Sequence, residues 1–277
     1  MPSSTFFIGG DRRVRRLGFG AMRLATSPES AREASITVAR HAVERGINLI
    51  DTAHLYGWGA NEELLADALH PYPEDLLITT KIGITRSSGA DEMSINGRPE
   101  VLHAQIDRAL TRLKVDSIEL LQLHRIDSDI PLSDQMGALR QAQEAGKVAK
   151  IGLSEVTVDQ LAQARQTVEI ASVQNRYSMF DRTHEPVLEA CEAAAIAFLP
   201  WRPVAEASGA HADITALASE LGATNTQLSL AWLLHRSPVI LPIPGTSSIA
   251  HLDENVAAAD LRLSAETLER IERLISS

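Results

Sequence analysis

The chain has 277 residues, of which 44% are hydrophobic and 22% are charged. This length and balance are typical of a folded globular protein, and they exclude a small disulfide scaffold and an intrinsically disordered chain. Lysine and arginine number 26 against 36 aspartate and glutamate residues, which gives a net charge of −10. Because that charge disfavours nonspecific attraction to nucleic acid or anionic lipid, we expect neither as a partner.

Cysteine usage and the N-terminus bear on the compartment. Cys191 is the only cysteine, so the chain forms no internal disulfide and has no thiol cluster for a metal ion. The first residues lack the apolar stretch of a secretion signal, and no run of about eighteen apolar residues indicates a membrane span. We therefore expect a cytoplasmic protein without membrane association.

Short apolar segments alternate with longer amphipathic segments along the chain, which is typical of strand–helix units around a parallel sheet. The pattern first predicts a hairpin from segments 5–7 and 14–16. Eight strands follow, at 17–20, 47–51, 76–81, 118–124, 148–154, 172–175, 196–201 and 239–243. Helices are predicted at 30–45, 61–69, 98–113, 133–145, 157–166, 185–194, 214–221, 225–236 and 248–258.

Eight such units predict a (β/α)8 TIM barrel with a short N-terminal β-hairpin, whereas a doubly wound open sheet usually has fewer strands. No linker or shift in composition divides the chain, so we expect residues 1–277 to form one domain. The least periodic stretch, 83–97, follows the third predicted strand and is predicted to be a loop over the site.

Four polar residues lie at or just after predicted strand ends, where the active site of a (β/α)8 barrel is found. Asp51, Lys81 and His124 end three successive strands, and Tyr56 follows Asp51 by five residues. We expect the ammonium of Lys81 to pair with Asp51 and to lower the pKa of the Tyr56 phenol. Tyr56 is then the predicted general acid, and a neutral His124 would orient a substrate carbonyl.

No dinucleotide-binding fingerprint is present, because the glycine pairs at 18–20 and 57–59 lack the third glycine. None of the three tyrosines is followed by lysine four positions later, which argues against short-chain dehydrogenase chemistry. The segment 242–248 (PIPGTSS) leads from the eighth predicted strand into a helix. Its hydroxyls and the helix N-terminus predict a phosphate site, with a simple serine N-cap as the alternative interpretation.

The segments DTAHLYG, TTK, LQLH, IGLSE, VQNRYS and IPGTSSIAHLDENVAA resemble the aldo-keto reductase family in order and spacing, over about residues 17–263. The resemblance implies a (β/α)8 barrel that reduces a small aldehyde or ketone to an alcohol with NADPH or NADH and without a metal ion. Asp51, Tyr56, Lys81 and His124 match the family's catalytic residues, with Tyr56 as proton donor. Because relatives are often monomers, a monomer is expected.

The resemblance also assigns the cofactor contacts. Those near the nicotinamide are Ala21, Met22, Asp51, Ser154, Gln174 and Asn175, with Trp201 stacked on the ring. Those near the adenosine and 2′-phosphate are Gly245, Thr246, Ser247, Ser248, His251, Glu254 and Asn255. Glu155 departs from the usual Asn or Arg.

The cofactor preference depends on how a 2′-phosphate would be held. Many relatives carry Lys or Arg where this chain has Gly245, Ser248 or His251, and a 2′-phosphate favours such a fixed cation. We still expect NADPH, with NADH as the alternative, because His251 and the hydroxyls at the helix N-terminus can hold the phosphate.

The same segments resemble bacterial family members that include pyridoxal reductases, so an aromatic aldehyde such as pyridoxal is the predicted substrate. Trp58 is expected to line its pocket with Tyr56 and His124. Arg86 and Arg98 are candidates for recognising an anionic group on the substrate.

Two other functions stay open on the sequence. A metal-dependent (β/α)8 hydrolase would use Asp51, His54 and His124 as ligands, although the first predicted strand supplies none. A nicotinamide-sensing subunit would bind the cofactor and report its redox state to a partner. Repeated oxidation of NADPH by an aldehyde distinguishes the enzyme from the sensor.

Overall fold

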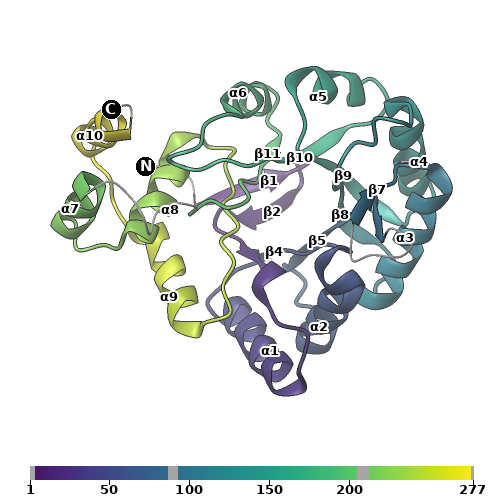
Figure 1. Cartoon of the computed structure of the whole chain (residues 1–277), viewed down its shortest axis with the longest axis horizontal. Coiled ribbons are helices and arrows are strands. Elements are labelled where there is room, and N and C mark those ends of the chain that lie inside the picture. Colours follow the sequence, from purple (N-terminus) through teal and green to yellow (C-terminus); the bar gives the residue numbers. More distant parts are fainter. Residues whose placement is uncertain (1–3, 87–92, 205–211, 276–277) are drawn as a thin grey trace.

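The protein is a curled parallel sheet with helices on its outer face (Figure 1), described by a computed structural model over residues 4–86, 93–204 and 212–275. Seven strands of these residues form the sheet, in the order β11-β10-β9-β8-β5-β4-β3, and every neighbouring pair is parallel. In chain order they are β3 (Phe19–Gly20), β4 (Leu49–Asp51), β5 (Leu77–Ile82), β8 (Ile118–Leu123), β9 (Val148–Ser154), β10 (Ile170–Gln174) and β11 (Ala197–Phe198).

The segment 239–244 bridges the two edges of this sheet. On one side Leu241 donates its N–H to the carbonyl of Phe198 at 2.8 Å, and on the other Gly18 donates to the carbonyl of Pro242 at 2.9 Å. The segment is not a regular strand, so the predicted strand at 239–243 is wrong. Pro242 and Pro244 have no N–H to donate, which limits the segment to isolated hydrogen bonds.

Most helices follow a strand and cover the outside of the sheet (Figure 1). They are α1 (Glu29–Glu44), α2 (Ala60–Leu69), α3 (Pro99–Leu113), α4 (Leu132–Glu144), α5 (Val158–Ala164), α6 (Glu185–Ala193), α8 (Asn225–Arg236) and α9 (Ile249–Ala257). Capping boxes start α5 and α8, where Thr157 and Thr224 each exchange hydrogen bonds with the residue three positions on. No described helix has both the length and the apolar character needed to cross a lipid bilayer.

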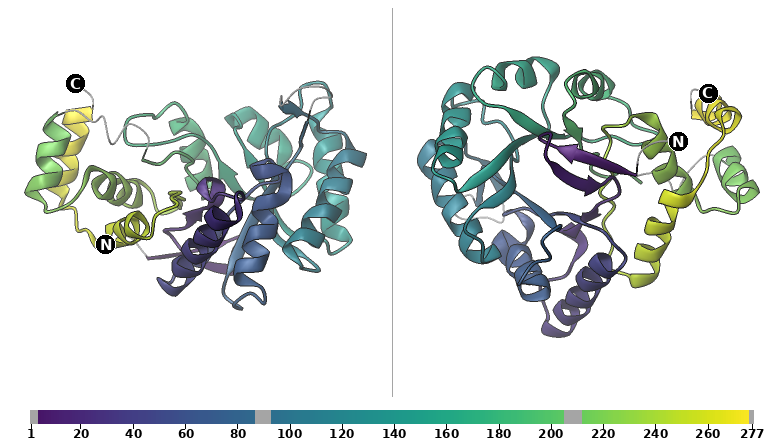
Figure 2. Two further views of the ribbon diagram at one scale, coloured as in Figure 1. Left: turned by 60° about the horizontal axis from the view of Figure 1, so that its bottom comes forward. Right: turned by 180° about the vertical axis from the view of Figure 1, so that it is seen from behind.

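Two further helices, α7 (Ala212–Glu220) and α10 (Ala265–Ile275), pack against each other at one edge of the molecule (Figure 2). The sequence analysis places no helix beyond residue 258, so α10 is an addition. Its apolar positions, Leu268, Ile271 and Leu274, recur at a spacing of three residues, which is the pattern of one helical face.

The predicted N-terminal hairpin is present as antiparallel β1 (Thr5–Ile8) and β2 (Arg12–Arg15). It crosses the end of the sheet at which the strands begin (Figure 2). Ile8 and Val14 are fully buried there, in one cluster with Leu49, Leu77 and Leu120 from three strands. The hairpin therefore covers the apolar interior at the end where the strands begin. Polar groups lie at the other end, where the strands finish.

The described parts of the predicted loop at 83–97 contain a second hairpin, so that prediction is wrong for both ends of the stretch. β6 (Ile84–Arg86) pairs antiparallel with β7 (Met93–Ile95), and the hydroxyls of Thr85 and Ser94 lie 3.0 Å apart across the pair. Residues 87–92 lie outside the described part of the chain. The strands are three residues long, too short for alternation to reveal them.

Candidate active site

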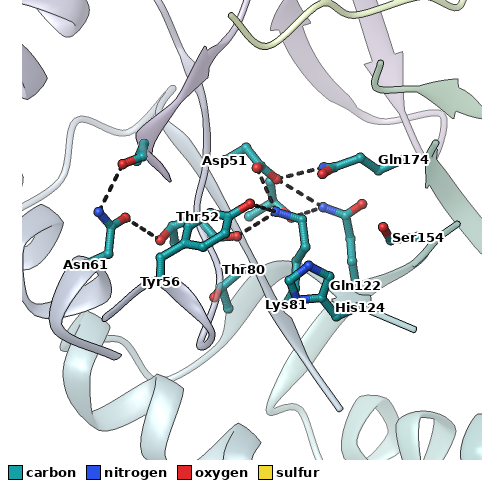
Figure 3. Close-up of polar contacts among 12 residues, drawn as sticks. Asp51, Thr52, Tyr56, Asn61, Thr80, Lys81, Gln122, His124, Ser154 and Gln174 are labelled. Atoms are coloured by element: carbon teal, nitrogen blue, oxygen red, sulfur yellow. Dashed lines mark hydrogen bonds and ion pairs between the residues drawn. The ribbon is translucent and has the colours of Figure 1, made fainter. Parts of the chain in front are cut away.

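Lys81 is the centre of a hydrogen-bonded cluster at the carboxyl ends of β4 and β5 (Figure 3). Its ammonium donates to Asp51 Oδ2 at 2.7 Å, to the Thr52 carbonyl at 2.9 Å and to Tyr56 Oη at 3.5 Å. Asp51 ends β4 and Lys81 lies near the end of β5, so the parallel pairing brings them to one edge of the sheet. The Lys81 side chain is 0% exposed, and the three acceptors use all three of its N–H bonds.

The electrostatics of the cluster differ in one respect from the prediction. Burial is the largest single influence on Lys81 and lowers its pKa, but Asp51 and Tyr56 together outweigh it and the pKa is raised. Burial also raises the pKa of Tyr56, and the nearby Lys81 ammonium only partly opposes this. The prediction that Lys81 lowers the Tyr56 pKa below its ordinary value is therefore wrong, because removing the phenol from water has the larger effect.

His124 follows β8 directly and presents its ring edge-on to Tyr56, with ring centroids 6.3 Å apart. Burial, together with the charges of Lys81 and Arg125, lowers the pKa of His124 to about 2. The ring is thus neutral at physiological pH, as predicted. Within the described residues its Nδ1 has no hydrogen-bond partner.

Two amide side chains hold the second carboxylate oxygen of Asp51. Gln174 Nε2 donates to Oδ1 at 2.8 Å, and Gln122 Nε2 lies 3.4 Å from the same atom (Figure 3). The sequence analysis missed Gln122. The two-residue period of a strand could have indicated Gln122. Gln122 lies on β8 two positions before His124, so the two side chains point to the same side of the sheet.

Asn61 connects the turn after β3 to this cluster, and the sequence analysis missed it as well. Its Oδ1 accepts from Thr52 Oγ1 at 2.6 Å, and its Nδ2 donates to the carbonyl of Ala21 at 3.0 Å. Ala21 is buried, whereas the neighbouring Met22 is 58% exposed. The backbone of the predicted nicotinamide segment is therefore fixed while the Met22 side chain faces solvent.

The turn η2 (Tyr56–Gly59) carries both Tyr56 and Trp58. The guanidinium of Arg86 lies 4.9 Å from the Trp58 ring centre, and His54 meets the same ring edge-on at 5.9 Å. Of the two arginines proposed for anion recognition, Arg86 thus lies beside the predicted substrate contact. Arg98 instead precedes α3 as its exposed N-cap residue.

Two of the predicted nicotinamide contacts, Ser154 and Asn175, differ in how their side chains are already bonded within the protein. Ser154 ends β9, and its hydroxyl accepts from Arg125 Nη1 at 3.2 Å. The Asn175 amide, by contrast, is used by the chain itself, since it exchanges two hydrogen bonds with the backbone of Val156.

Trp201 is hydrogen-bonded to Glu155, the residue at which the sequence departs from the usual Asn or Arg of the family. Its Nε1 donates to Glu155 Oε1, and the backbone N–H of Arg176 donates to the same oxygen at 2.7 Å. Glu155 therefore holds the indole of Trp201 in place.

The predicted phosphate residues gather at the start of α9. Ser248 is its N-cap: its hydroxyl accepts from the His251 N–H, and its own N–H donates to Thr246 Oγ1 at 3.1 Å. Ser247 and His251 are exposed beside it. Glu254 accepts from Thr224 Oγ1 at the start of α8, and Asn255 is buried, so these two join α9 to the body of the protein.

The Lys81 cluster and the start of α9 together offer polar groups for the two ends of a nicotinamide dinucleotide. Gln122 Oε1 and His124 Nδ1 are buried polar atoms without partners among the described residues, at the place expected for the nicotinamide. At the other end, the first N–H groups of α9 and the hydroxyls before it are the donors that a phosphate requires.

The alternative of a metal-dependent hydrolase is not supported by the geometry. Asp51 is bound by Lys81, and His54 Nδ1 accepts from Arg112 Nη1 at 2.9 Å. The described ranges hold no group of three or more His, Cys, Asp or Glu side chains suited to a metal ion.

Comparison with known proteins decides the family. The profile of the aldo/keto reductase family matches residues 16–276. The chain belongs to this family. It is 42% identical to an uncharacterised oxidoreductase of Schizosaccharomyces pombe, over 95% of this chain and 87% of the relative. It is 39% identical to pyridoxine 4-dehydrogenase of Escherichia coli, over 98% of both.

Solved structures of this family share the fold. A glycerol dehydrogenase of Gluconobacter oxydans has a TM-score of 0.90 at 22% identity, over 100% of this chain and 96% of that one. An aldo/keto reductase of Klebsiella pneumoniae, solved with NADP and acetate, has a TM-score of 0.86 at 26% identity, over 99% and 95%. The aldo/keto reductase described here is accordingly an NAD(P)H-dependent oxidoreductase.

Proposed function

We propose that this protein reduces aldehydes or ketones to alcohols with NADPH, and that Tyr56 is the proton donor. The observation that carries the proposal is the position of the Lys81 ammonium, bonded to Asp51 at 2.7 Å and to the Tyr56 hydroxyl at 3.5 Å. We also propose that residues 1–277 form one domain, a (β/α)8 barrel in which segment 239–244 occupies the position of the eighth strand. The protein is proposed to be a monomer.

The proposed cofactor is NADPH, which when bound supplies the hydride. Two related Klebsiella pneumoniae structures, solved with NADP and with NADPH, support this choice. The proposed contacts near the nicotinamide are Ala21, Met22, Asp51, Ser154, Gln174 and Trp201. Those near the adenosine and its 2′-phosphate are Gly245, Thr246, Ser247, Ser248, His251, Glu254 and Asn255.

The proton step follows from the charges around Tyr56. Because burial keeps the pKa of the phenol high, Tyr56 stays protonated and available as a donor at neutral pH. As it gives its proton to the carbonyl oxygen, the phenolate left behind is stabilised by the ammonium of Lys81. Asp51 keeps that ammonium charged and in position.

The neutral ring of His124 acts as a hydrogen-bond donor beside Tyr56. A ring whose pKa is about 2 donates one N–H to the carbonyl oxygen without competing for the proton of Tyr56. The edge-on contact between the two rings directs both groups to one side of the cluster. Together they orient and polarise the carbonyl.

For the substrate we propose an aromatic aldehyde such as pyridoxal, contacted by Tyr56, Trp58 and His124. The name of the Escherichia coli relative, pyridoxine 4-dehydrogenase, supports this class. The indole of Trp58 offers a flat surface for an aromatic ring, and Arg86 is held against it.

The test is a steady-state assay of the purified protein with pyridoxal, other aromatic aldehydes, glyoxals and simple sugars, each with NADPH and with NADH. We expect many turnovers per enzyme with aromatic aldehydes and a higher kcat/KM with NADPH. Binding of NADPH without repeated turnover on any carbonyl would instead support the sensing subunit and reject the enzyme.

A further inference from the structure

Glu155 lies at the rim of the candidate active site, directly after Ser154 at the end of β9. Its backbone N–H donates to the carbonyl of Gln174 at 3.0 Å, and the side chain of Gln174 in turn bonds Asp51. Figure 3 shows Ser154 and Gln174 on the same side of the Lys81 cluster. The Glu155 side chain is partly buried, and the proposed proton transfer does not use it.

The backbone of Glu155 has a conformation that few glutamates adopt. Its φ is 56°, in the left-handed region where a side chain is unfavourable and glycine is the usual residue. A strained position that keeps a large polar side chain points to a role for that side chain. The sequence thus keeps a carboxylate where glycine would suit the backbone better.

Both carboxylate oxygens of Glu155 face N–H groups of the protein. Oε1 accepts from Trp201 Nε1 and from the backbone N–H of Arg176, the latter at 2.7 Å. Oε2 lies 3.7 Å from His184 Nε2. Because two N–H groups share one oxygen, the carboxylate is fixed, and it fixes the indole in turn.

His184 is itself oriented by its neighbours. The Asn175 amide accepts from the Val156 N–H through Oδ1 and donates to the Val156 carbonyl through Nδ2. Asn175 Nδ2 also lies 3.0 Å from His184 Nδ1, so it donates there and leaves the proton of the neutral ring on Nε2. The imidazole therefore presents an N–H to the second oxygen of Glu155.

Trp201 is held at its backbone as well as at its indole. Its N–H donates to the carbonyl of Asn175 at 3.2 Å, and it bridges to Arg176 just beyond the end of β10. The next residue, Arg202, has a φ of 54°, so the chain turns directly after the indole. With the backbone held in this way, the bond to Glu155 fixes the side-chain torsions of Trp201.

We propose that Glu155 is a positioning residue that sets the plane of the Trp201 indole against the nicotinamide, and that it does not contact the cofactor itself. The inference rests on the proposed function, in which Trp201 contacts the nicotinamide. Two flat rings pack well only when their planes match, so an indole free to rotate offers the required plane for only part of the time. Both oxygens of Glu155 already face the protein, so the residue acts through Trp201.

The test is a double-variant cycle on the full chain, with the Kd for NADPH measured by isothermal titration calorimetry. Glu155→Ala removes the carboxylate, whereas Glu155→Gln keeps an oxygen that accepts from the indole and from Arg176. Trp201→Phe keeps a stacking ring but has no N–H for Glu155 to hold, so Glu155→Ala is also combined with Trp201→Phe. The matched control is Glu144→Ala, an exposed glutamate of α4 that pairs with Arg140.

We expect Glu155→Ala to raise the Kd about three- to tenfold, because an indole spread over three staggered rotamers presents the required plane for about a third of the time or less. Glu155→Gln should restore the Kd to within about 1.5-fold of the wild type, because it keeps the acceptor. Adding Glu155→Ala to Trp201→Phe should change the Kd by less than about 1.5-fold, since the indole N–H is already gone. The control should keep the wild-type Kd.

An equal rise in Kd with and without Trp201→Phe would mean that Glu155 contacts the cofactor directly. An unchanged Kd in Glu155→Ala would mean that the indole needs no support. Either result would overturn the inference and leave the proposed function standing, whereas no binding of NADPH to the wild type would reject both. If Glu155→Ala does not fold, Glu155→Gly replaces it, because glycine readily adopts a φ of 56°.

Discussion

At the scale of single residues, Lys81 connects structure with chemistry. A buried ammonium is costly unless its three N–H bonds find acceptors, and here Asp51, the Thr52 carbonyl and Tyr56 supply them. The carboxylate and the carbonyl are permanent acceptors. The phenol is the one partner that gains from the charge when it loses a proton, so one lysine both stabilises the site and assists the proposed proton transfer.

His54 also carries a pH dependence, which concerns stability. Its Nδ1 accepts from Arg112, and burial together with Arg112 lowers its pKa from 6.5 to about 4. The unfolded chain therefore binds the extra proton more readily, and folding stability is lost as the pH falls from 6.5 toward 4. We expect this residue alone to reduce the free energy of unfolding by about 1.5 kcal/mol between about pH 6.5 and pH 5.

Urea unfolding at several pH values measures this effect. The wild type and His54→Asn should differ in how steeply stability falls on acidification, with the variant flatter by that amount. His103→Asn, at a histidine whose ring bonds Gln141 on the surface, is the control for removing an imidazole. Identical slopes in the wild type and His54→Asn would show that the buried ring is not the source.

At the scale of elements, the turn η2 combines an unusual backbone with a neighbouring helix side chain. Gly57, Trp58 and Gly59 all have positive φ, at 62°, 56° and 102°, directly after the proposed proton donor. Arg112 of α3 lies against this turn and bonds His54 and Glu62 on either side of it. The helix after one strand thus fixes the turn after the preceding strand, which positions Tyr56.

Gly59→Ala tests this positioning. A Cβ at Gly59 would lie 2.2 Å from Arg112 Cζ, and the φ of 102° is unfavourable for any side chain. We expect a loss of about 1–3 kcal/mol in the free energy of unfolding and a fall in kcat, because Arg112 or the turn must move.

Gly137→Ala is the matched control. Gly137 lies within α4 with nothing near its Cβ position, so alanine should leave kcat unchanged and stabilise by up to about 1 kcal/mol. Unchanged kcat in Gly59→Ala would mean that Arg112 does not position the proton donor.

Helices and strands that are determined by residues close together in the sequence could be predicted, and those that depend on distant pairing could not. The strand at 148–154 and the helix at 225–236 have the predicted bounds, because apolar runs and a capping box are local signals. The apolar residues of segment 239–243 predict a strand, but Pro242 within it and Pro244 directly after it limit the ladder. The β6–β7 hairpin depends on pairing between two three-residue strands, which no local pattern reveals.

At the scale of the whole molecule, the two ends of the sheet have different tasks. The hairpin fills the end where the strands begin with apolar side chains, and the carboxyl ends hold the polar cluster. Strand ends alone predicted Asp51, Lys81 and His124. They did not predict Arg112, because it reaches the site from α3 and nothing in the sequence spacing indicates that reach. Arg125 directly follows His124 and was missed although it also lies just after a strand end.

Ile8→Ala tests the hairpin as a closure of the interior. Ile8 is fully buried against strand residues, so truncation should lower the free energy of unfolding by about 2–4 kcal/mol. Phe7→Ala, at the adjacent and 51% exposed position of the same strand, should cost less than about 1 kcal/mol. Equal losses, measured by denaturant unfolding, would mean that the hairpin acts only through its pairing.

The central claim is that the Tyr56 hydroxyl gives its proton to a carbonyl beside the buried Lys81–Asp51 pair. Tyr56→Phe removes that single oxygen, and comparing kcat for an aromatic aldehyde with the Kd for NADPH measures its role most directly. We predict a fall in kcat of about 10²–10⁴-fold, with the Kd changed less than about twofold. A variant that keeps the wild-type kcat would contradict the account.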